Sequence, residues 1–407
     1  MATEYLTNDI ELTSVADAIR AKSGQIGQLI YPDGFASAVA GIKKAPATPY
    51  MEAEYVEGVD YIGGTNHYIK SAKLYNHTAI YAYEFTGQVK LKNLDLSDAS
   101  NNITAIEIQA FQLALVDELV LPNTISVLMS ECFLSAFITT LTVPPLVTVL
   151  PTNAFAQIQP AYNSETGEEL PINIILPQNL TKIEAHCFDG AQIKQIAIPD
   201  TVAEIGENAF NYCDQLASIT LPSGLQKISN RMLAGCMSLT SIAIPASITE
   251  ISSQAFASSG LTSITIPSTV TTLGSGAFAD CESLTSMDIQ ANVVEIPEFF
   301  AQGCPLTSLT LPNTLQTIGA SAFANANVFQ ITELTIPASV TSIEDYAFGS
   351  NHASQITLTV LPTTPPTLGK NVFNLATGSV IKVPAASVAA YKAADGWKDW
   401  ADKIVGI

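Results

Sequence analysis

The chain has 407 residues, of which 47% are hydrophobic and only 13% carry a charge. The 37 acidic residues outnumber the 17 basic ones, which gives a net charge of −20 at pH 7. Nucleic-acid binding requires clustered lysine and arginine, so this balance argues against it. The sequence contains no apolar run long enough for a transmembrane helix, and its polar, acidic start does not resemble a secretory signal.

Residues 1–42 are predicted to form a small helical module. Leu12, Val15 and Ile19 recur at helical spacing, and Gly24 ends this first helix. The run ELTSVADAIR, followed by PDGF, resembles an N-terminal module of phage tail-associated proteins. This resemblance implies that the module docks to a phage particle or another partner. The alternative is a helical cap on the segment that follows.

Residues 43–72 are predicted to be a linker and a β cap. The composition of 43–50 (KKAPATPY) is typical of a linker, and short strands are expected after it. This cap is rich in tyrosine, namely Tyr55, Tyr61 and Tyr68. The tyrosines either shield an exposed edge strand or offer a surface on which sugars stack.

Residues 73–383 repeat one unit, in steps that are mostly 22 or 23 residues long. The copy LTSITIPSTVTTLGSGAF at 261–278 shows its two most regular columns, a proline and an aromatic residue. Gln290 replaces the proline once, and Leu233 replaces the aromatic residue once. The proline column is Pro122, Pro144, Pro177, Pro199, Pro222, Pro245, Pro267, Pro312, Pro337, Pro362 and Pro384. The aromatic column is Phe85, Phe111, Phe133, Phe155, Phe188, Phe210, Phe256, Phe278, Phe300, Phe323, Phe348 and Phe373.

This period predicts a solenoid of stacked coils. Ile264 and Ile266 alternate with polar residues as in a half-buried strand, and Pro267 ends that strand. Phe278 is expected to fill the core from the opposite side. A single coil cannot bury its apolar face, but stacked coils can, with their strands in a parallel sheet along one side.

The copies LPSGLQKISNRMLAGC (221–236) and LPNTLQTIGASAFANA (311–326) resemble the BspA-like leucine-rich repeat family of bacterial surface proteins. The resemblance covers the chain from about residue 73 to its end. It implies an α/β repeat solenoid, curved and right-handed, built mostly of short β-strands. It also implies a binding role without enzyme activity. Together with the phage-tail resemblance of residues 1–42, it implies an extracellular, cell-surface or virion-associated location.

One step, from Pro144 to Pro177, is longer by an acidic insertion at 157–170 (QIQPAYNSETGEEL). A solvated loop is the first interpretation of this insertion. The alternative is a Ca²⁺ site formed by Glu165, Glu168 and Glu169, although their spacing matches no known calcium loop.

The cysteines recur near the aromatic column, which indicates small buried residues. They are Cys132, Cys187, Cys213, Cys236, Cys281 and Cys304. No two form a C-x-x-C pair, so a metal site is disfavoured, and free buried thiols are expected instead of disulfides.

Residues 384–407 change period and are predicted to form a C-terminal helical cap. Tyr391, Trp397, Trp400 and Ile404 recur at helical spacing. The last coil of a solenoid would otherwise expose its core, so an amphipathic helix is expected over it. This segment also resembles the C-terminal cap of BspA-like proteins.

The sequence predicts no enzyme: it contains no motif for a catalytic nucleophile, a phosphate loop or a metal, and we expect no cofactor. The outward positions of the predicted sheet are instead rich in hydroxyl groups. They predict a binding face for a protein or polysaccharide on a cell surface, whereas the alternative is a rigid spacer arm without a ligand. The candidate binding residues are Ser218, Thr220, Ser241, Ser263, Thr265, Ser308 and Thr310.

Overall fold

The structure is a computed structural model that describes residues 49–407 except 60–64, 90, 92, 117–118, 163–165, 167, 325–329 and 350–354. The helical module predicted in residues 1–42 therefore lies outside the described residues. The described residues form two compact units, one made of those in 49–78 and 90–103, and the other of those in 79–89 and 104–407. Within the described ranges, no helix has the length and hydropathy needed to cross a bilayer.

The first unit is built on a long hairpin. Strands β1 (Tyr50–Val59) and β2 (Thr65–Tyr75) pair antiparallel along their whole length, and β4 (Asn93–Asp95) adds to β2 in parallel. The sequence predicted only short strands here. The difference arises because the alternation of apolar and polar residues from Met51 to Tyr55 breaks at Val56, next to the register shift between Glu54 and Tyr55, so the period of two covers only half of β1.

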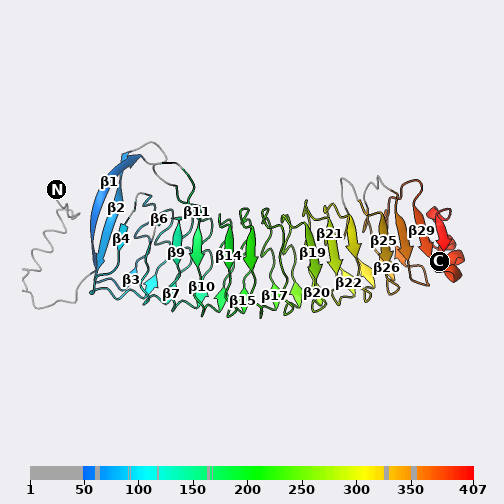
Figure 1. Cartoon of the computed structure of the whole chain (residues 1–407), viewed down its shortest axis with the longest axis horizontal. Helices are drawn as coiled ribbons and strands as arrows, with labels where there is room; N and C mark the ends of the chain where they lie inside the picture. The colour runs from blue at the N-terminus through cyan, green and yellow to red at the C-terminus, as the bar shows by residue number, and fades with distance from the viewer. Residues whose placement is uncertain are drawn as a thin grey trace, which may run out of the picture. The chain divides into compact units, whose positions relative to one another are not determined.

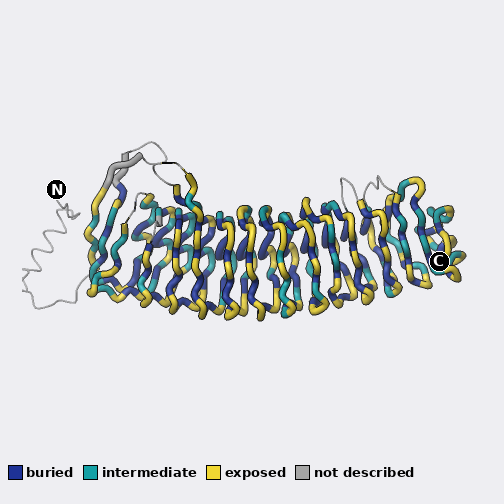
Figure 2. The backbone as a smooth tube through the Cα atoms, viewed as in Figure 1, coloured by how far each residue is buried: buried dark blue, intermediate teal, exposed yellow. Residues whose placement is uncertain are grey.

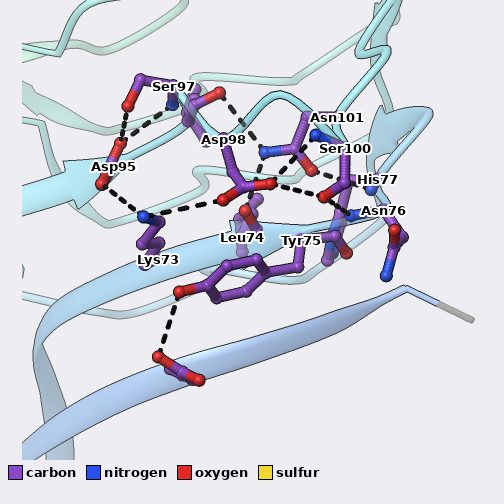
Figure 3. A network of polar contacts seen from close by, with 12 residues as sticks. Lys73, Leu74, Tyr75, Asn76, His77, Asp95, Ser97, Asp98, Ser100 and Asn101 are labelled. Atoms are coloured by element: carbon purple, nitrogen blue, oxygen red, sulfur yellow. Dashed lines mark hydrogen bonds and ion pairs between the residues drawn. The ribbon is translucent and has the colours of Figure 1, made fainter. Parts of the chain in front are cut away.

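Hydrogen bonds and ion pairs connect the turn after β4 with β2 (Figure 3). The Lys73 ammonium lies 3.7 Å from a carboxylate oxygen of Asp95 and 3.7 Å from one of Asp98. Ser97 donates hydrogen bonds to Asp95, and Ser100 donates to Asp98. These hydrogen bonds, with the nearby ammonium, lower the pKa of both carboxyl groups. Each carboxylate is therefore held in its charged form by its own turn as well as by Lys73.

The second unit is a solenoid of about 14 turns with strands along two of its sides (Figure 1). We call these the long-strand face and the short-strand face. The sequence predicted one parallel sheet. The second was missed because its strands have only two residues each, which is too short for a periodicity to register.

The long-strand face carries three- and four-residue strands, with two-residue extensions in the early coils. Its strands are β6 (Leu115–Val116), β8 (Phe137–Ile138), β9 (Thr140–Thr142), β11 (Gln159–Pro160), β12 (Asn173–Ile175), β14 (Gln195–Ala197), β16 (Ser218–Thr220), β19 (Ser263–Ile266), β21 (Ser286–Ile289), β23 (Ser308–Thr310), β25 (Glu333–Ile336), β27 (Thr357–Val360), β29 (Val380–Val383) and β30 (Ile404–Gly406).

In most coils the short strand follows the proline of the column, after a tight turn. The strands of the short-strand face are β3 (Ala79–Ile80), β5 (Ala105–Ile106), β7 (Val127–Leu128), β10 (Val149–Leu150), β13 (Lys182–Ile183), β15 (Glu204–Ile205), β17 (Lys227–Ile228), β18 (Glu250–Ile251), β20 (Thr272–Leu273), β22 (Glu295–Ile296), β24 (Thr317–Ile318), β26 (Ser342–Ile343) and β28 (Thr367–Leu368).

Buried and exposed residues alternate along the coils, as the sequence predicted (Figure 2). In β19, Ile264 and Ile266 are buried while Ser263 and Thr265 are exposed. The aromatic column lies in the turns that follow the short strands. Its side chains point into the core, where the rings of successive coils stack in a row that we call the ring file. Neighbouring rings stack with their centroids 5.1–5.5 Å apart and within 12° of parallel, except beside Leu233 and Phe300.

The assignment of Phe300 to the aromatic column is wrong by one residue. The backbone N–H of Phe256 donates to Ala277, the residue before Phe278, whereas the N–H of Phe278 donates to Phe300 itself. Ala301 therefore occupies the backbone position that the aromatic residue holds in other coils. The Phe300 side chain still reaches the core, but it meets its neighbouring rings edge-on, at 74° and 80°.

All six cysteines are free and buried, which confirms the prediction. Four of them share one role, since each thiol donates to the carbonyl of the aromatic-column residue of the preceding coil. Their sulfur–oxygen distances are 3.0–3.2 Å, for Cys213 to Phe188, Cys236 to Phe210, Cys281 to Phe256 and Cys304 to Phe278. The cysteines therefore satisfy buried carbonyls between coils.

We expect the Cys236 thiol to resist alkylation in the folded protein. Burial raises the pKa of Cys236 to about 12, whereas an exposed cysteine titrates near 8.5. The thiolate fraction at pH 8 should therefore fall roughly a thousandfold on folding. Iodoacetamide labelling followed by peptide mass spectrometry, with and without urea, measures this ratio. Labelling of Cys236 at equal rates in both conditions would contradict the expected burial.

The C-terminal cap contains less helix than predicted. Its elements are η1 (Ala385–Ser387), α3 (Val388–Ala393), η2 (Lys398–Trp400) and then β30, which pairs with β29. Thus one short α-helix replaces the expected amphipathic helix, and the chain returns to the long-strand face. The reason is side-chain hydrogen bonding: Tyr391 donates to the Pro362 carbonyl and Trp397 to the Pro366 carbonyl, each at 2.8 Å, which fixes both rings over the last coil.

Candidate functional site on the long-strand face

Four of the predicted binding residues lie together. Ser263 and Thr265 are on β19, Ser308 and Thr310 are on β23, and β21 pairs with both strands. The register places the side chain of Asp288 between Thr265 and Thr310. All four hydroxyl residues are exposed, because alternate residues of these strands face away from the core.

The other three predicted residues are not part of this sheet. Ser218 and Thr220 are exposed on β16, which pairs with β14 instead. Ser241 is exposed but lies outside any strand, in a coil where Ile242 and Ile244 are only half-buried. The hydroxyl-rich surface is therefore divided at this coil. The sequence could not show this, because the coil keeps the pattern of the repeat.

A hollow of about 400 Å³ with a mixed polar and apolar lining adjoins the β19–β21–β23 sheet, in the coil where Gln290 replaces the proline. The Gln290 amide donates to a carboxylate oxygen of Asp288 at 2.7 Å. The lining is Ser268, Asp288, Ile289, Gln290, Ala291, Asn292, Thr310, Leu311, Pro312, Asn313 and Thr314. Amides, hydroxyls and one carboxylate can exchange hydrogen bonds with a polar ligand, which suits recognition.

A smaller hollow, of about 150 Å³, lies beside the insertion. Its lining comes from three successive coils and was not predicted as a group, although the long proline step and Tyr162 mark the place. The residues are Gln159, Pro160, Tyr162, Glu169, Leu170, Pro171, Ile172, Gln192, Lys194 and Gln215.

The alternative of a Ca²⁺ site in the insertion gains no support. Glu165 lies outside the described residues, and Glu168 and Glu169 are exposed. Across the part of the chain that the structure describes, no group of three or more His, Cys, Asp or Glu residues is arranged to hold a metal ion.

The short-strand face has a different chemical character in the middle of the solenoid. Lys182 pairs with Glu204 on the next strand at 3.1 Å, and Lys227 pairs with Glu250 at 2.9 Å. Such exposed pairs contribute little to stability. They do, however, give these lysines a counter-ion within the protein, whereas the hydroxyl rows of the long-strand face are open to a partner.

Stacked coils with a strand, a tight turn and a core-filling aromatic residue define a leucine-rich repeat solenoid. The family model for the BspA type Leucine rich repeat region matches residues 65–161, 169–262 and 249–378. Because these matches cover most of its length, the chain belongs to the BspA-type leucine-rich repeat family. Proteins of this family are generally binding scaffolds, and are typically found at the cell surface or secreted.

The chain is also similar to solved structures of bacterial leucine-rich repeat proteins. A leucine-rich repeat protein from Bacteroides ovatus is 19% identical, covering 87% of this chain and 98% of that one, with a TM-score of 0.47. A leucine rich cell surface protein from Faecalibacterium prausnitzii is 21% identical, covering 81% of this chain and 96% of that one, with a TM-score of 0.43. No curated protein sequence matches the chain.

Proposed function

We propose that this chain is a non-enzymatic adhesion protein whose long-strand face binds a protein or polysaccharide on a cell surface. The observation that carries the proposal is the β19–β21–β23 sheet, where exposed hydroxyl side chains on β19 and β23 lie on either side of the half-buried Ser286 and Asp288 of β21. Strands in such a sheet are about 4.8 Å apart. Hydrogen-bonding groups at this spacing suit an extended partner that is held by many weak contacts.

The double substitution Thr265→Arg with Thr310→Arg tests whether the long-strand face binds the partner. Two bulky cations should displace a partner from the sheet, and we expect cell-surface binding to weaken about tenfold or more. The matched control is Thr272→Arg with Thr367→Arg, which adds the same charge to exposed positions of the short-strand face. Binding is measured by flow cytometry with labelled protein, and thermal unfolding of each variant checks the fold. Equal binding by both double variants would reject the long-strand face.

That negative outcome would favour the second candidate function, a rigid spacer whose ends make the contacts. The proposed docking of residues 1–42 to a phage particle belongs with the adhesion proposal, because it would present the binding face of the solenoid on a phage tail. It rests on the sequence resemblance alone. Fractionation of a native culture, with and without prophage induction, tests it, because a phage-borne chain would sediment with particles and a surface adhesin would stay with the cell wall.

A further inference from the structure

The described residues at the two ends of the insertion meet in a β-bridge. Tyr162 forms this antiparallel bridge with Glu169. The N–H of Leu170 donates to the Ala161 carbonyl at 2.8 Å, which closes the base of the insertion. The Tyr162 hydroxyl lies 3.4 Å from the Glu169 carboxylate. The tyrosine is thereby held at the rim of the 150 Å³ hollow, with 56% of its surface exposed.

The floor of this hollow combines amide groups from three successive coils. Gln159, Gln192 and Gln215 line it, and the N–H of Gln192 donates to the Ile158 carbonyl at 3.0 Å, which sets the register between the first two coils. Each amide can both donate and accept a hydrogen bond. An aromatic ring beside such amides matches the surface of a pyranose, which has apolar C–H faces and a rim of hydroxyl groups.

The charged side chains that line the hollow bear on the charge of the ligand that it could bind. Lys194 is exposed and is one of the residues that line the hollow. No carboxylate among the described residues lies within 4.0 Å of its ammonium, whereas Lys182 has Glu204 at 3.1 Å. The lining also contains one carboxylate, Glu169, which lies within hydrogen-bonding distance of the Tyr162 hydroxyl. Lys194 is therefore the charged group of the lining that can pair with a carboxylate carried by the ligand.

We propose that this hollow binds one acidic pyranose, a uronic acid unit of a glycan. Tyr162 packs against the sugar ring, Lys194 pairs with the sugar carboxylate, and the three glutamines hydrogen-bond to the hydroxyl groups. The inference deepens the proposed function, on which it rests, by naming the class of glycan. It places this contact at the insertion, apart from the β19–β21–β23 sheet.

Saturation-transfer NMR on the full chain tests the site, with glucuronate as the probe and glucose as its neutral counterpart. We expect glucuronate to bind about tenfold more tightly than glucose, because only glucuronate can pair with Lys194. Tyr162→Ala and Lys194→Gln should each weaken glucuronate binding about tenfold. The matched controls, Tyr346→Ala and Lys392→Gln, change exposed residues far along the chain and should leave it unchanged.

Absence of saturation transfer to glucuronate, or transfer that persists in Tyr162→Ala, would overturn the proposal. Equal affinity for glucose and glucuronate would overturn the assignment to an acidic sugar. These outcomes are separate from failure of the proposed function, which is measured as cell binding by the Thr265→Arg and Thr310→Arg double variant.

Discussion

Phe133→Ala is expected to destabilise the solenoid by about 3–5 kcal/mol, the usual cost of removing a buried phenylalanine ring. Phe133 is fully buried, and it stacks on Phe111 at 5.1 Å and on Phe155 at 5.3 Å. The alanine variant leaves a cavity between two rings that the backbone ladder holds in place. Chemical denaturation followed by circular dichroism measures the loss.

The chain provides its own control for this experiment. Leu233 occupies the same column and is fully buried, so leucine is compatible with the coil geometry. Phe133→Leu should therefore cost much less than Phe133→Ala, about 1–2 kcal/mol. If the two variants were equally destabilised, the ring file would not be filling the core as described. Because solenoids unfold in segments, hydrogen exchange should show the loss concentrated in the coils next to residue 133.

Trp397→Ala is expected to open the C-terminal end of the solenoid. Trp397 is fully buried, its indole N–H donates to the Pro366 carbonyl, and its ring lies 6.2 Å from Phe373, the last member of the ring file. The substitution removes a large buried side chain and leaves a buried carbonyl without its donor. Together these should cost about 4 kcal/mol or more locally.

Hydrogen exchange of the β29 amides measures this effect, since β29 and β30 are the last strands of the long-strand face. Faster exchange in β29, with unchanged exchange in β9, is the expected pattern. Trp400→Ala is the control, because Trp400 contacts the same Phe373 at 6.0 Å but is only half-buried. Unchanged β29 protection in Trp397→Ala would show that the cap does not hold the last coils.

The repeat pattern was sufficient to predict the stacked coils, the buried and exposed positions of β19, and the free, buried cysteines. The reason is physical: each coil meets the same environment, so side chains at one period position are selected for the same burial. The resemblance to BspA-like proteins followed from the same columns, and the family match confirms it.

Other features depended on contacts between coils that a single period does not reveal. The short-strand face exists because two-residue strands gain their hydrogen bonds from neighbouring coils, and local propensity does not show this. Phe300 is aromatic, as the repeat predicts. The backbone hydrogen bond from Ala301 to Ala322 nevertheless puts Ala301 in the column position, so that Phe300 lies one residue before it. The cap likewise depends on where Tyr391 and Trp397 find carbonyl partners.

The two candidate sites show the same division between sequence and tertiary structure. Outward-facing Thr265 and Thr310 could be predicted from strand alternation, but their position on either side of Asp288 depends on the pairing register. The insertion and Tyr162 mark the place of the smaller hollow in the sequence, but its lining could not be predicted, because Gln192 and Lys194 lie about a coil away from Tyr162 in sequence. Periodicity determines which way a side chain faces, whereas stacking determines which side chains become neighbours.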